Sequence, residues 1–290
     1  MIAERTFTIF EILKWATLEL EGGPVLSPDV EAERIVGDTV GLSRADLYLN
    51  KERILCEAEV KLIEEAVKER LTGRPLQYIL GRSQFRYLGL VCQEGVLIPR
   101  PETELLVDEA LAKLKSLGGP RNVLDLGCGT GAIALSIAYE YPKANVYASD
   151  VSSQALELTR ENAVLNGLAG KIQIIKSSLF KALGNLVGQL DMIISNPPYI
   201  PSNELKNLQR EVQFEPALAL DGGRDGLKFY RLIASQSPEF LKPGGVLLLE
   251  VGVNQAASVA NMLKSAGCFN NIDITKDYQG IERIVKARRK

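Results

Sequence analysis

The chain has 290 residues, 46% of them hydrophobic, which is enough for one large domain with a buried core and a smaller second domain. Its 34 basic and 36 acidic side chains give a formal net charge of -2, which argues against a surface that wraps nucleic acid. The absence of histidine excludes serine-histidine hydrolysis, cysteine-histidine proteolysis and any histidine general base.

The cysteines and the N-terminal stretch exclude further classes. The four cysteines lie far apart without a Cys-x-x-Cys pair, so we expect neither a bound metal nor a disulfide framework. Glu4, Arg5, Glu11 and Lys14 interrupt the first apolar stretch, which therefore lacks the apolar core of a signal peptide. Because no stretch approaches about 20 apolar residues, we expect a cytoplasmic protein without membrane partners.

Residues 1–76 are expected to form a small helical domain. Apolar residues recur three and four positions apart in 8–20 and 57–71, as in amphipathic helices. Ser27, Pro28 and Asp29 predict another helix start, with a capping side chain, a proline in the first turn and an acid near the positive end of the helix dipole. Residues 77–100 are rich in β-branched and aromatic residues with glycines between them, and they predict a β-hairpin linker.

Residues 101–290 alternate between helical and strand patterns. Helices are expected at 104–117, 132–141, 153–167, 225–241 and 255–267, and strands at 122–126, 144–150, 171–176, 190–195, 244–251, 271–276 and 281–287. This alternation predicts an α/β domain with a doubly wound, mostly parallel seven-stranded sheet that binds ligands at the carboxyl ends of its strands. No helix separates the last two strands, so one of them is expected to be antiparallel.

A glycine-rich loop lies between the strand expected at 122–126 and the next helix. Gly127, Gly129 and Gly131 would let the backbone approach a ligand closely, although a tight turn alone could also require them. The G-x-G-x-G spacing, with Asp125 two residues ahead of it, differs from the dinucleotide pattern G-x-G-x-x-G. It resembles motif I of the class I S-adenosylmethionine-dependent methyltransferases.

Asp150 ends the next expected strand, nineteen residues after Gly131. A carboxylate at this edge of the sheet can accept hydrogen bonds from two ribose hydroxyls. It could instead cap the helix that begins near Ser152. We prefer the ribose, because the glycine loop and Asp150 fall on adjacent strand ends, as a nucleoside site requires.

Asn196, Pro197, Pro198 and Tyr199 follow the apolar strand expected at 190–195. Prolines fix their own backbone and bias the preceding residue to an extended conformation, so the segment should be stiff. They commonly terminate strands, but that explanation leaves Asn196 and Tyr199 without a reason.

These residues fit the chemistry of methyl transfer to a planar NH2 group. Such a group carries two hydrogens and needs two acceptors, which the Asn196 side-chain oxygen and the Pro197 carbonyl could provide. The ring of Tyr199 could then supply a flat surface for the group. The exocyclic amine of a nucleic-acid base and the side-chain amide of glutamine both meet this description, and the motif does not choose between them.

The chain resembles the release-factor glutamine methyltransferases, which methylate N5 of the glutamine in the Gly-Gly-Gln motif of peptide chain release factors. The resemblance is carried by residues 73–85, 96–107, 123–138, 194–201 and 215–231. With the helical region it covers essentially the whole chain. It implies S-adenosylmethionine as the cofactor, class 1 release factors as the protein substrate, and partner recognition by residues 1–76.

The resemblance also assigns roles to individual residues. It implies catalytic roles for Asn196, Pro197 and Tyr199, and it implies that Asn196, Pro197, Pro198 and Tyr199 hold the glutamine amide. The implied cofactor-binding residues are Gly127, Cys128, Gly129, Thr130, Gly131, Asp150, Leu179 and Asn196. Where the family commonly has an acidic residue followed by an apolar or aromatic one, this chain has Ser178 and Leu179.

Three points stay open at the level of sequence. Arg100 and Glu102 either order the entrance of the cleft or belong to a helix start. A DNA or RNA base methyltransferase of the adenine N6 type is the main alternative, but it should show a basic stripe or an added recognition domain, and no direct nucleic-acid contact is expected. A non-catalytic module that binds a nucleotide or partner through the same fold is the third possibility.

Overall fold

The computed structural model describes residues 7–290 and divides into two compact units. The helical unit extends to Gly81 and also includes Gln209–Phe214, and the sheet unit comprises Arg82–Leu208 and Glu215–Lys290. The chain therefore passes from one unit to the other after Gly81, after Leu208 and after Phe214. None of the helices within residues 7–290 is long and apolar enough to cross a membrane.

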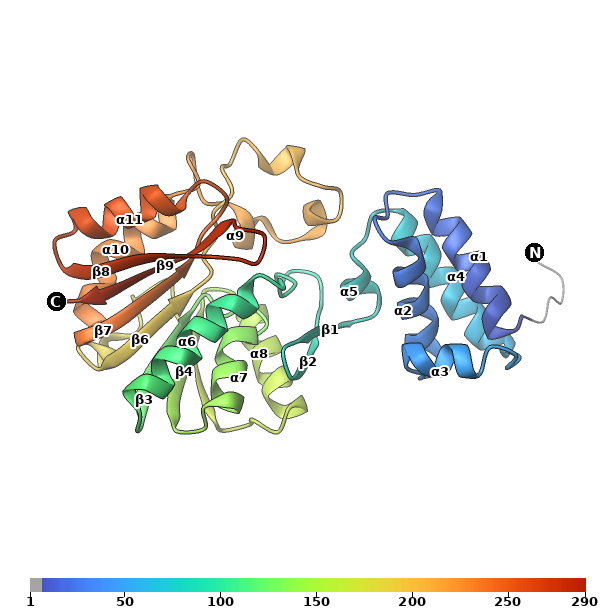
Figure 1. Cartoon of the computed structure of the whole chain (residues 1–290), viewed down its shortest axis with the longest axis horizontal. Helices are drawn as coiled ribbons and strands as arrows, with labels where there is room; N and C mark the ends of the chain where they lie inside the picture. The colour runs from blue at the N-terminus through green and yellow to red at the C-terminus, as the bar shows by residue number, and fades with distance from the viewer. Residues whose placement is uncertain (1–6) are drawn as a thin grey trace. The chain divides into compact units, whose positions relative to one another are not determined.

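The helical unit is built from α1 (Ile9–Glu21), α2 (Pro28–Val40), α3 (Arg44–Leu49), α4 (Glu57–Leu71) and α5 (Leu76–Ile79) (Figure 1). Its core is mainly aliphatic and includes Ile12, Ile35 and Ile63 from the three longest of these helices. Thr8 and Glu11 form a capping box at the start of α1. Ser27 is the N-cap residue of α2, as expected, but its side chain makes no capping hydrogen bond, so that part of the prediction is wrong. Its ψ of 72° lies outside the extended region that is typical of a capping residue.

A buried arginine fixes Gln209–Phe214 in the helical unit. Arg70 is only 1% exposed, and its guanidinium pairs with Glu31, with Nη2 and Oε1 3.1 Å apart, and with Glu211. A buried charge requires such partners, because an unpaired one would cost several kcal/mol. Gly73 has a φ of 91°, and a Cβ there would lie 2.6 Å from the Arg210 side chain. The segment that contains Arg210 and Glu211 is thus packed closely against the end of α4.

The first strands of the sheet unit, β1 (Arg82–Phe85) and β2 (Leu88–Val91), form an antiparallel hairpin. Phe85, Leu88 and Leu90 are buried in the core of the unit. The backbone N–H of Val91 donates to Oδ1 of Asn162 at 2.7 Å, which ties the hairpin to a helix beside the sheet.

Within the described residues the main sheet has seven strands in the order β5-β4-β3-β6-β7-β9-β8. Their bounds are β3 (Arg121–Leu126), β4 (Ala144–Asp150), β5 (Ile172–Lys176), β6 (Leu190–Ser195), β7 (Leu241–Glu250), β8 (Phe269–Lys276) and β9 (Glu282–Arg289). The first five strands in this order, β5, β4, β3, β6 and β7, pair in parallel with their neighbours in that series. The strand β9 is antiparallel to both β7 and β8. The predicted fold class is confirmed, including the single antiparallel strand near the C-terminus.

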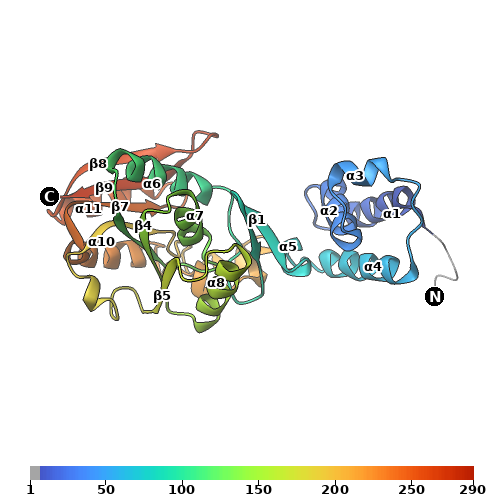
Figure 2. The same cartoon turned by 90° about the horizontal axis from the view of Figure 1, so that it is seen from below.

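Helices cover both faces of this sheet, as Figures 1 and 2 show. One face packs against α6 (Thr103–Leu117), α7 (Ala132–Glu140) and α8 (Ser153–Leu165), and the other against α10 (Lys228–Phe240) and α11 (Ala256–Ser265). Shorter helical turns are η1 (Gly184–Leu186), η2 (Leu205–Asn207) and α9 (Ala217–Leu220) in this unit, and η3 (Val212–Phe214) in the helical unit.

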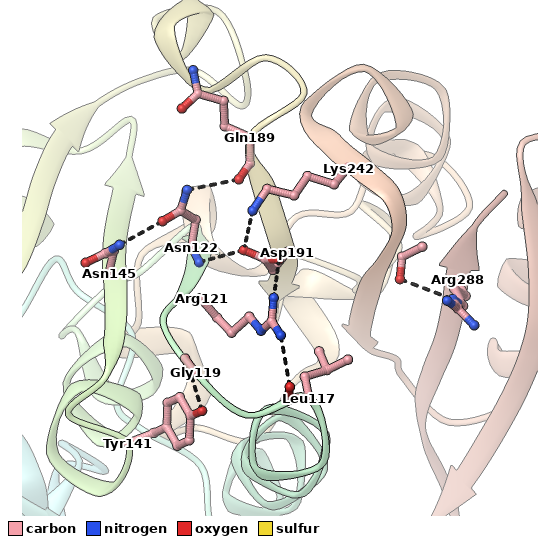
Figure 3. Close-up of polar contacts among 11 residues, drawn as sticks. Leu117, Gly119, Arg121, Asn122, Tyr141, Asn145, Gln189, Asp191, Lys242 and Arg288 are labelled. Carbon is pink, nitrogen blue, oxygen red and sulfur yellow. Dashed lines mark hydrogen bonds and ion pairs between the residues drawn. The ribbon is translucent and has the colours of Figure 1, made fainter.

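A polar network closes the amino edge of the sheet (Figure 3). Asp191, at the start of β6, accepts a hydrogen bond from the backbone N–H of Asn122 at 2.9 Å and pairs with Lys242 at 2.7 Å and Arg121 at 3.4 Å. Burial opposes ionisation, but the hydrogen bonds from Lys242 and Asn122 outweigh it and lower the pKa of Asp191. These contacts serve stability, because they lie at the opposite edge from the carboxyl ends of the strands.

Candidate active site

A cavity of about 390 Å³ opens at the carboxyl ends of β3, β4, β5 and β6. Its volume lies within the range of small-ligand sites, and its position follows the rule for open parallel sheets. Most of the residues that the sequence assigns to a site line it, namely Gly127, Cys128, Gly129, Thr130, Asp150, Leu179, Asn196, Pro197 and Pro198. Gly131 and Tyr199 are not among the lining residues, and each supports a segment that is.

The glycine loop holds its shape through backbone conformation. Gly127, Gly129 and Gly131 have φ values of 83°, 56° and 84°, in the region that favours glycine. A Cβ on Gly131 would lie 2.8 Å from the Thr159 side chain, so packing also requires glycine there. At Gly127 such a Cβ would meet no atom of residues 7–290 within 4 Å, apart from the glycine itself and its chain neighbours. The loop therefore packs tightly behind Gly131 and is open at Gly127.

Asp150 braces this loop from the neighbouring strand. Its Oδ2 accepts a hydrogen bond from the backbone N–H of Gly129 at 3.0 Å, and its Oδ1 accepts one from the N–H of Ser152 at 2.8 Å. The N-cap residue of α8 is Ser152, whose side chain accepts from Ala155. Asp150 is therefore not the helix cap, and its half-buried carboxylate lines the cavity with lone pairs to spare.

Two side chains behind the loop, those of Asp125 and Cys128, are buried. Asp125 is 1% exposed and accepts from the N–H of Ala134 at 3.0 Å, and burial raises its pKa to about 7. Burial raises the pKa of the Cys128 thiol as well, and its sulfur lies 3.5 Å from the Thr159 hydroxyl. Cys128 therefore acts as a small packing residue rather than as a nucleophile.

Ser178 and Leu179 form another part of the cavity wall, after β5. Leu179 adopts a positive φ of 51°, and its carbonyl accepts a hydrogen bond from the Ser177 hydroxyl at 2.6 Å. At this turn the side chain of Leu179 is apolar and half-buried, and Ser178 is exposed. Ligand pockets are lined mainly by apolar side chains with a few polar groups, as this wall is.

Asn196 stands directly after β6, which pairs with β3, so the asparagine and the glycine loop share one edge of the sheet. Its side-chain Nδ2 donates to the hydroxyl of Thr103 at 3.2 Å. In the described part of the chain no donor bonds to its Oδ1. The amide group is therefore held at its nitrogen and is available as an acceptor at its oxygen.

The backbone around Tyr199 is held by a second segment. The Tyr199 carbonyl accepts from Nε2 of Gln255 at 2.9 Å, and Oε1 of the same side chain accepts from the N–H of Gly252 at 3.1 Å. A Cβ on Gly222 or Gly226 would lie within 2.7 Å of Tyr199 atoms. Residues 215–231 therefore brace residues 194–201, which brings together two stretches that are distant in sequence.

The two open possibilities for Arg100 and Glu102 have different outcomes. Arg100 forms an ion pair with Glu215, whose other carboxylate oxygen accepts from the N–H of Ile98 at 3.0 Å. Arg100 also lines the cavity, so this ion pair holds part of the cavity wall. Glu102 is the N-cap residue of α6, without a side-chain capping bond.

Sequence reasoning missed Thr103, Gln255 and Glu215, all of which hold residues of this site. Each acts on a residue at least 50 positions away, so no local pattern marks it. The cavity nevertheless brings together an open glycine loop, the carboxylate of Asp150 and the side-chain oxygen of Asn196.

Comparisons with known proteins agree with this geometry. Residues 101–217 match the family described as Methyltransferase small domain, and residues 11–81 match the PrmC N-terminal domain. A solved methyltransferase from Pyrococcus furiosus is 20% identical, with a TM-score of 0.50 over 69% of this chain and 88% of that one, which supports the fold. The protein is a methyltransferase of the class I fold.

Curated relatives define the family more closely. The release factor glutamine methyltransferase of Geobacter sulfurreducens is 40% identical over 97% of this chain and 97% of its own length. That of Moorella thermoacetica is 38% identical over 98% of this chain and 99% of its own length. The chain belongs to the release factor glutamine methyltransferase family.

Proposed function

We propose that this protein transfers a methyl group from S-adenosylmethionine to the side-chain amide nitrogen of the glutamine in the Gly-Gly-Gln motif of class 1 peptide chain release factors. The observation that carries the proposal is the Asn196 amide, held at its nitrogen by Thr103 beside the glycine loop, with its oxygen available to a substrate. Family membership supports glutamine over a nucleic-acid base as the owner of the NH2 group.

The residues around the cavity suit S-adenosylmethionine. The volume of about 390 Å³ and the open surface at Gly127 leave room for a nucleoside. We propose that Asp150 accepts hydrogen bonds from the ribose, that Leu179 packs on the adenine, and that residues 127–131 face the remainder of the cofactor. The bound cofactor supplies an electrophilic methyl group on a sulfonium.

The protein's part in the reaction is to aim a weak nucleophile. The lone pair of an amide nitrogen is delocalised, so its two hydrogens must be held by two acceptors before the nitrogen can face the methyl group. In our proposal the Asn196 Oδ1 and the Pro197 carbonyl take these hydrogens, and the Tyr199 ring lies against the amide plane. The nitrogen sheds one proton to water only after methylation has made it acidic, so no strong base is required.

The test is a transfer assay with isotopically labelled S-adenosylmethionine and a purified release factor. We expect one methyl group on the peptide that contains the Gly-Gly-Gln glutamine, located by mass spectrometry, and none when that glutamine is replaced by alanine. Undiminished label on the replaced factor contradicts the proposal. So does preferential transfer to DNA or RNA offered in the same reaction.

Two asparagine variants sharpen this test. Asn196→Ala should lower kcat about 100- to 1,000-fold, the usual effect of removing one preorganised group from a reaction centre. Its affinity for S-adenosylmethionine should change far less. Asn207→Ala makes the same chemical change at an exposed position of the sheet unit and should keep full activity.

We also propose that the helical unit helps to bind the release factor, in the cytoplasm where translation ends. Large apolar side chains are exposed on it, among them Leu49 at 81%, Ile54 at 64% and Leu62 at 56%, which is typical of interaction surfaces when such residues cluster. Leu49→Ser should raise KM for the intact release factor without altering cofactor affinity. An unchanged KM in this variant and in Leu62→Ser would contradict this role.

A further inference from the structure

Glu250 is a buried acidic side chain at the carboxyl end of β7. It is 3% exposed, and within residues 7–290 its Oε2 has no hydrogen-bond partner. Its backbone carbonyl accepts from the Tyr230 hydroxyl at 2.9 Å, so its position is fixed. Burying a carboxyl group with an unpaired oxygen costs free energy, and the apolar strand that precedes Glu250 offers no compensation.

The register of the sheet places Glu250 beside Asn196. Ser195, the last residue of β6, lies opposite Leu249 of β7. Asn196 and Glu250 are the residues that follow this pair. Side chains alternate between the two faces of a sheet. Even-numbered residues of both strands, namely Met192, Ile194, Val246 and Leu248, pack in the core that contains α6. Asn196 and Glu250 continue this series toward the first turn of α6.

Thr103, the first residue of α6, stands between them. Its Oγ1 accepts from Nδ2 of Asn196 at 3.2 Å. The same side chain is near enough to the Glu250 carboxyl group to oppose the rise of its pKa. Thr103 is 5% exposed and Glu250 is 3% exposed, so water has little access to either side chain. A threonine hydroxyl has one hydrogen to give and two lone pairs to receive. If the hydrogen goes to Glu250, the oxygen facing Asn196 can only accept.

We propose that Glu250 is a positioning residue for methyl transfer, acting through Thr103 to fix which way the Asn196 amide faces. This inference rests on the proposed role of Asn196 as an acceptor for the substrate amide. An ionised Glu250 only accepts, so it takes the Thr103 hydrogen, and Thr103 then takes a hydrogen from Nδ2. The Asn196 oxygen is turned to the substrate. A flipped Asn196 would present its own NH2 group to the substrate NH2 group, with donors facing donors.

This arrangement depends on the protonation of Glu250. Burial is the main reason that its pKa is raised to about 7, while the side chain of Thr103 opposes the rise. The nearby charges are Glu102 before α6, Arg100 beside it and Arg283 on β9, and the phenols of Tyr199 and Tyr230 are also close. A protonated Glu250 can donate to Thr103, and the direction of the chain is then no longer fixed. The kcat of the wild type should therefore fall as the pH drops through about 7.

The experiment compares Thr103→Val, Thr103→Ser and Glu250→Gln with the wild type in the full-length protein. Kinetics are measured with release factor and S-adenosylmethionine across the pH range. Thr103→Val should lower kcat about 10- to 100-fold, the equivalent of losing a hydrogen bond in a chain that ends on a charge, with KM and cofactor Kd nearly unchanged. Thr103→Ser keeps the hydroxyl and should restore most of kcat. Glu250→Gln should lower kcat about tenfold near pH 8 and abolish the decline below about pH 7.

Three results would overturn the proposal. They are full kcat in Thr103→Val, equal losses in the valine and serine variants, and a Glu250→Gln variant that keeps the acidic decline. If Glu250→Gln does not fold, the two Thr103 variants still decide. A wild type that methylates the glutamine alongside an unimpaired Thr103→Val refutes this inference alone. A wild type that does not methylate the glutamine refutes the proposed function as well.

Discussion

Replacing Glu250 by glutamine should stabilise the sheet unit at neutral pH, although it impairs the proposed reaction. The pKa of Glu250 rises from its ordinary value of 4.5 to about 7 on folding, chiefly because of burial. The folded protein then holds a proton that the unfolded chain has released, so stability falls as the pH rises from 4.5 to about 7. The full pKa shift corresponds to a loss of about 3 kcal/mol in unfolding free energy. This loss is complete above the folded-state pKa and absent below the ordinary pKa.

Glutamine has nearly the same shape and does not ionise. The quantity to compare is the unfolding free energy of Glu250→Gln minus that of the wild type. We expect this difference to increase by about 2 to 3 kcal/mol from about pH 5 to pH 8. The new NH2 group faces the place where Oε2 has no partner, which subtracts about 1 to 2 kcal/mol at every pH. The change with pH is therefore the quantity to measure, rather than the absolute difference.

The assay must follow the correct unit. The chain has one tryptophan, Trp15 in α1, so tryptophan fluorescence reports on the helical unit. Urea unfolding should instead be followed by hydrogen exchange of peptides from β7, read by mass spectrometry. Glu157→Gln makes the same change at an exposed position and should leave the difference flat. A flat difference for Glu250→Gln, or one that decreases toward pH 8, refutes the reasoning.

Three further predictions concern the loop, the ribose and the amino edge of the sheet. Gly131→Ala should weaken S-adenosylmethionine binding and lower the unfolding free energy by about 1 to 3 kcal/mol, because of its φ of 84° and the contact of 2.8 Å with Thr159. Gly170 has a φ of 77°, and a Cβ there would have open space around it. Gly170→Ala should therefore lower the unfolding free energy only by the cost of the strained backbone. Asp150→Ala should raise the cofactor Kd about 10- to 100-fold by calorimetry, and an unchanged Kd would exclude its ribose role. Asp191→Ala should cost about 2 kcal/mol in urea unfolding at neutral pH without affecting cofactor Kd. That cost should vanish in acid, since a carboxyl with a lowered pKa contributes stability above its ordinary value of 3.8 and loses it as the pH falls.

The sequence predicted the sheet well because its evidence is local. Apolar strands, the glycine loop and the prolines after β6 each carry their signal within a few residues, and parallel pairing then brings Gly127, Asp150 and Asn196 to one edge. The same argument could have found Glu250, a single charge that ends an apolar run in the next strand.

The residues that hold the site were harder to predict. Thr103 meets Asn196, and Gln255 meets Tyr199, only because the register of β6 and β7 and the start of α6 bring them together. Ser27 shows the reverse failure, since its sequence context is right but its backbone is not extended enough for the cap. Tertiary packing decides such contacts, and no periodicity encodes them.

The segment 209–214 has a consequence for how this family can change over time. It follows the Asn-Pro-Pro-Tyr stretch in the chain, yet Glu211 belongs to the helical unit through Arg70. A helical unit exchanged between relatives as one contiguous piece of sequence would set the donor's residue 70 against the recipient's own residue 211. Where relatives differ at these two positions, recombination should succeed best when residues 209–214 travel with the N-terminal piece, and substitutions at Arg70 and Glu211 should covary across relatives.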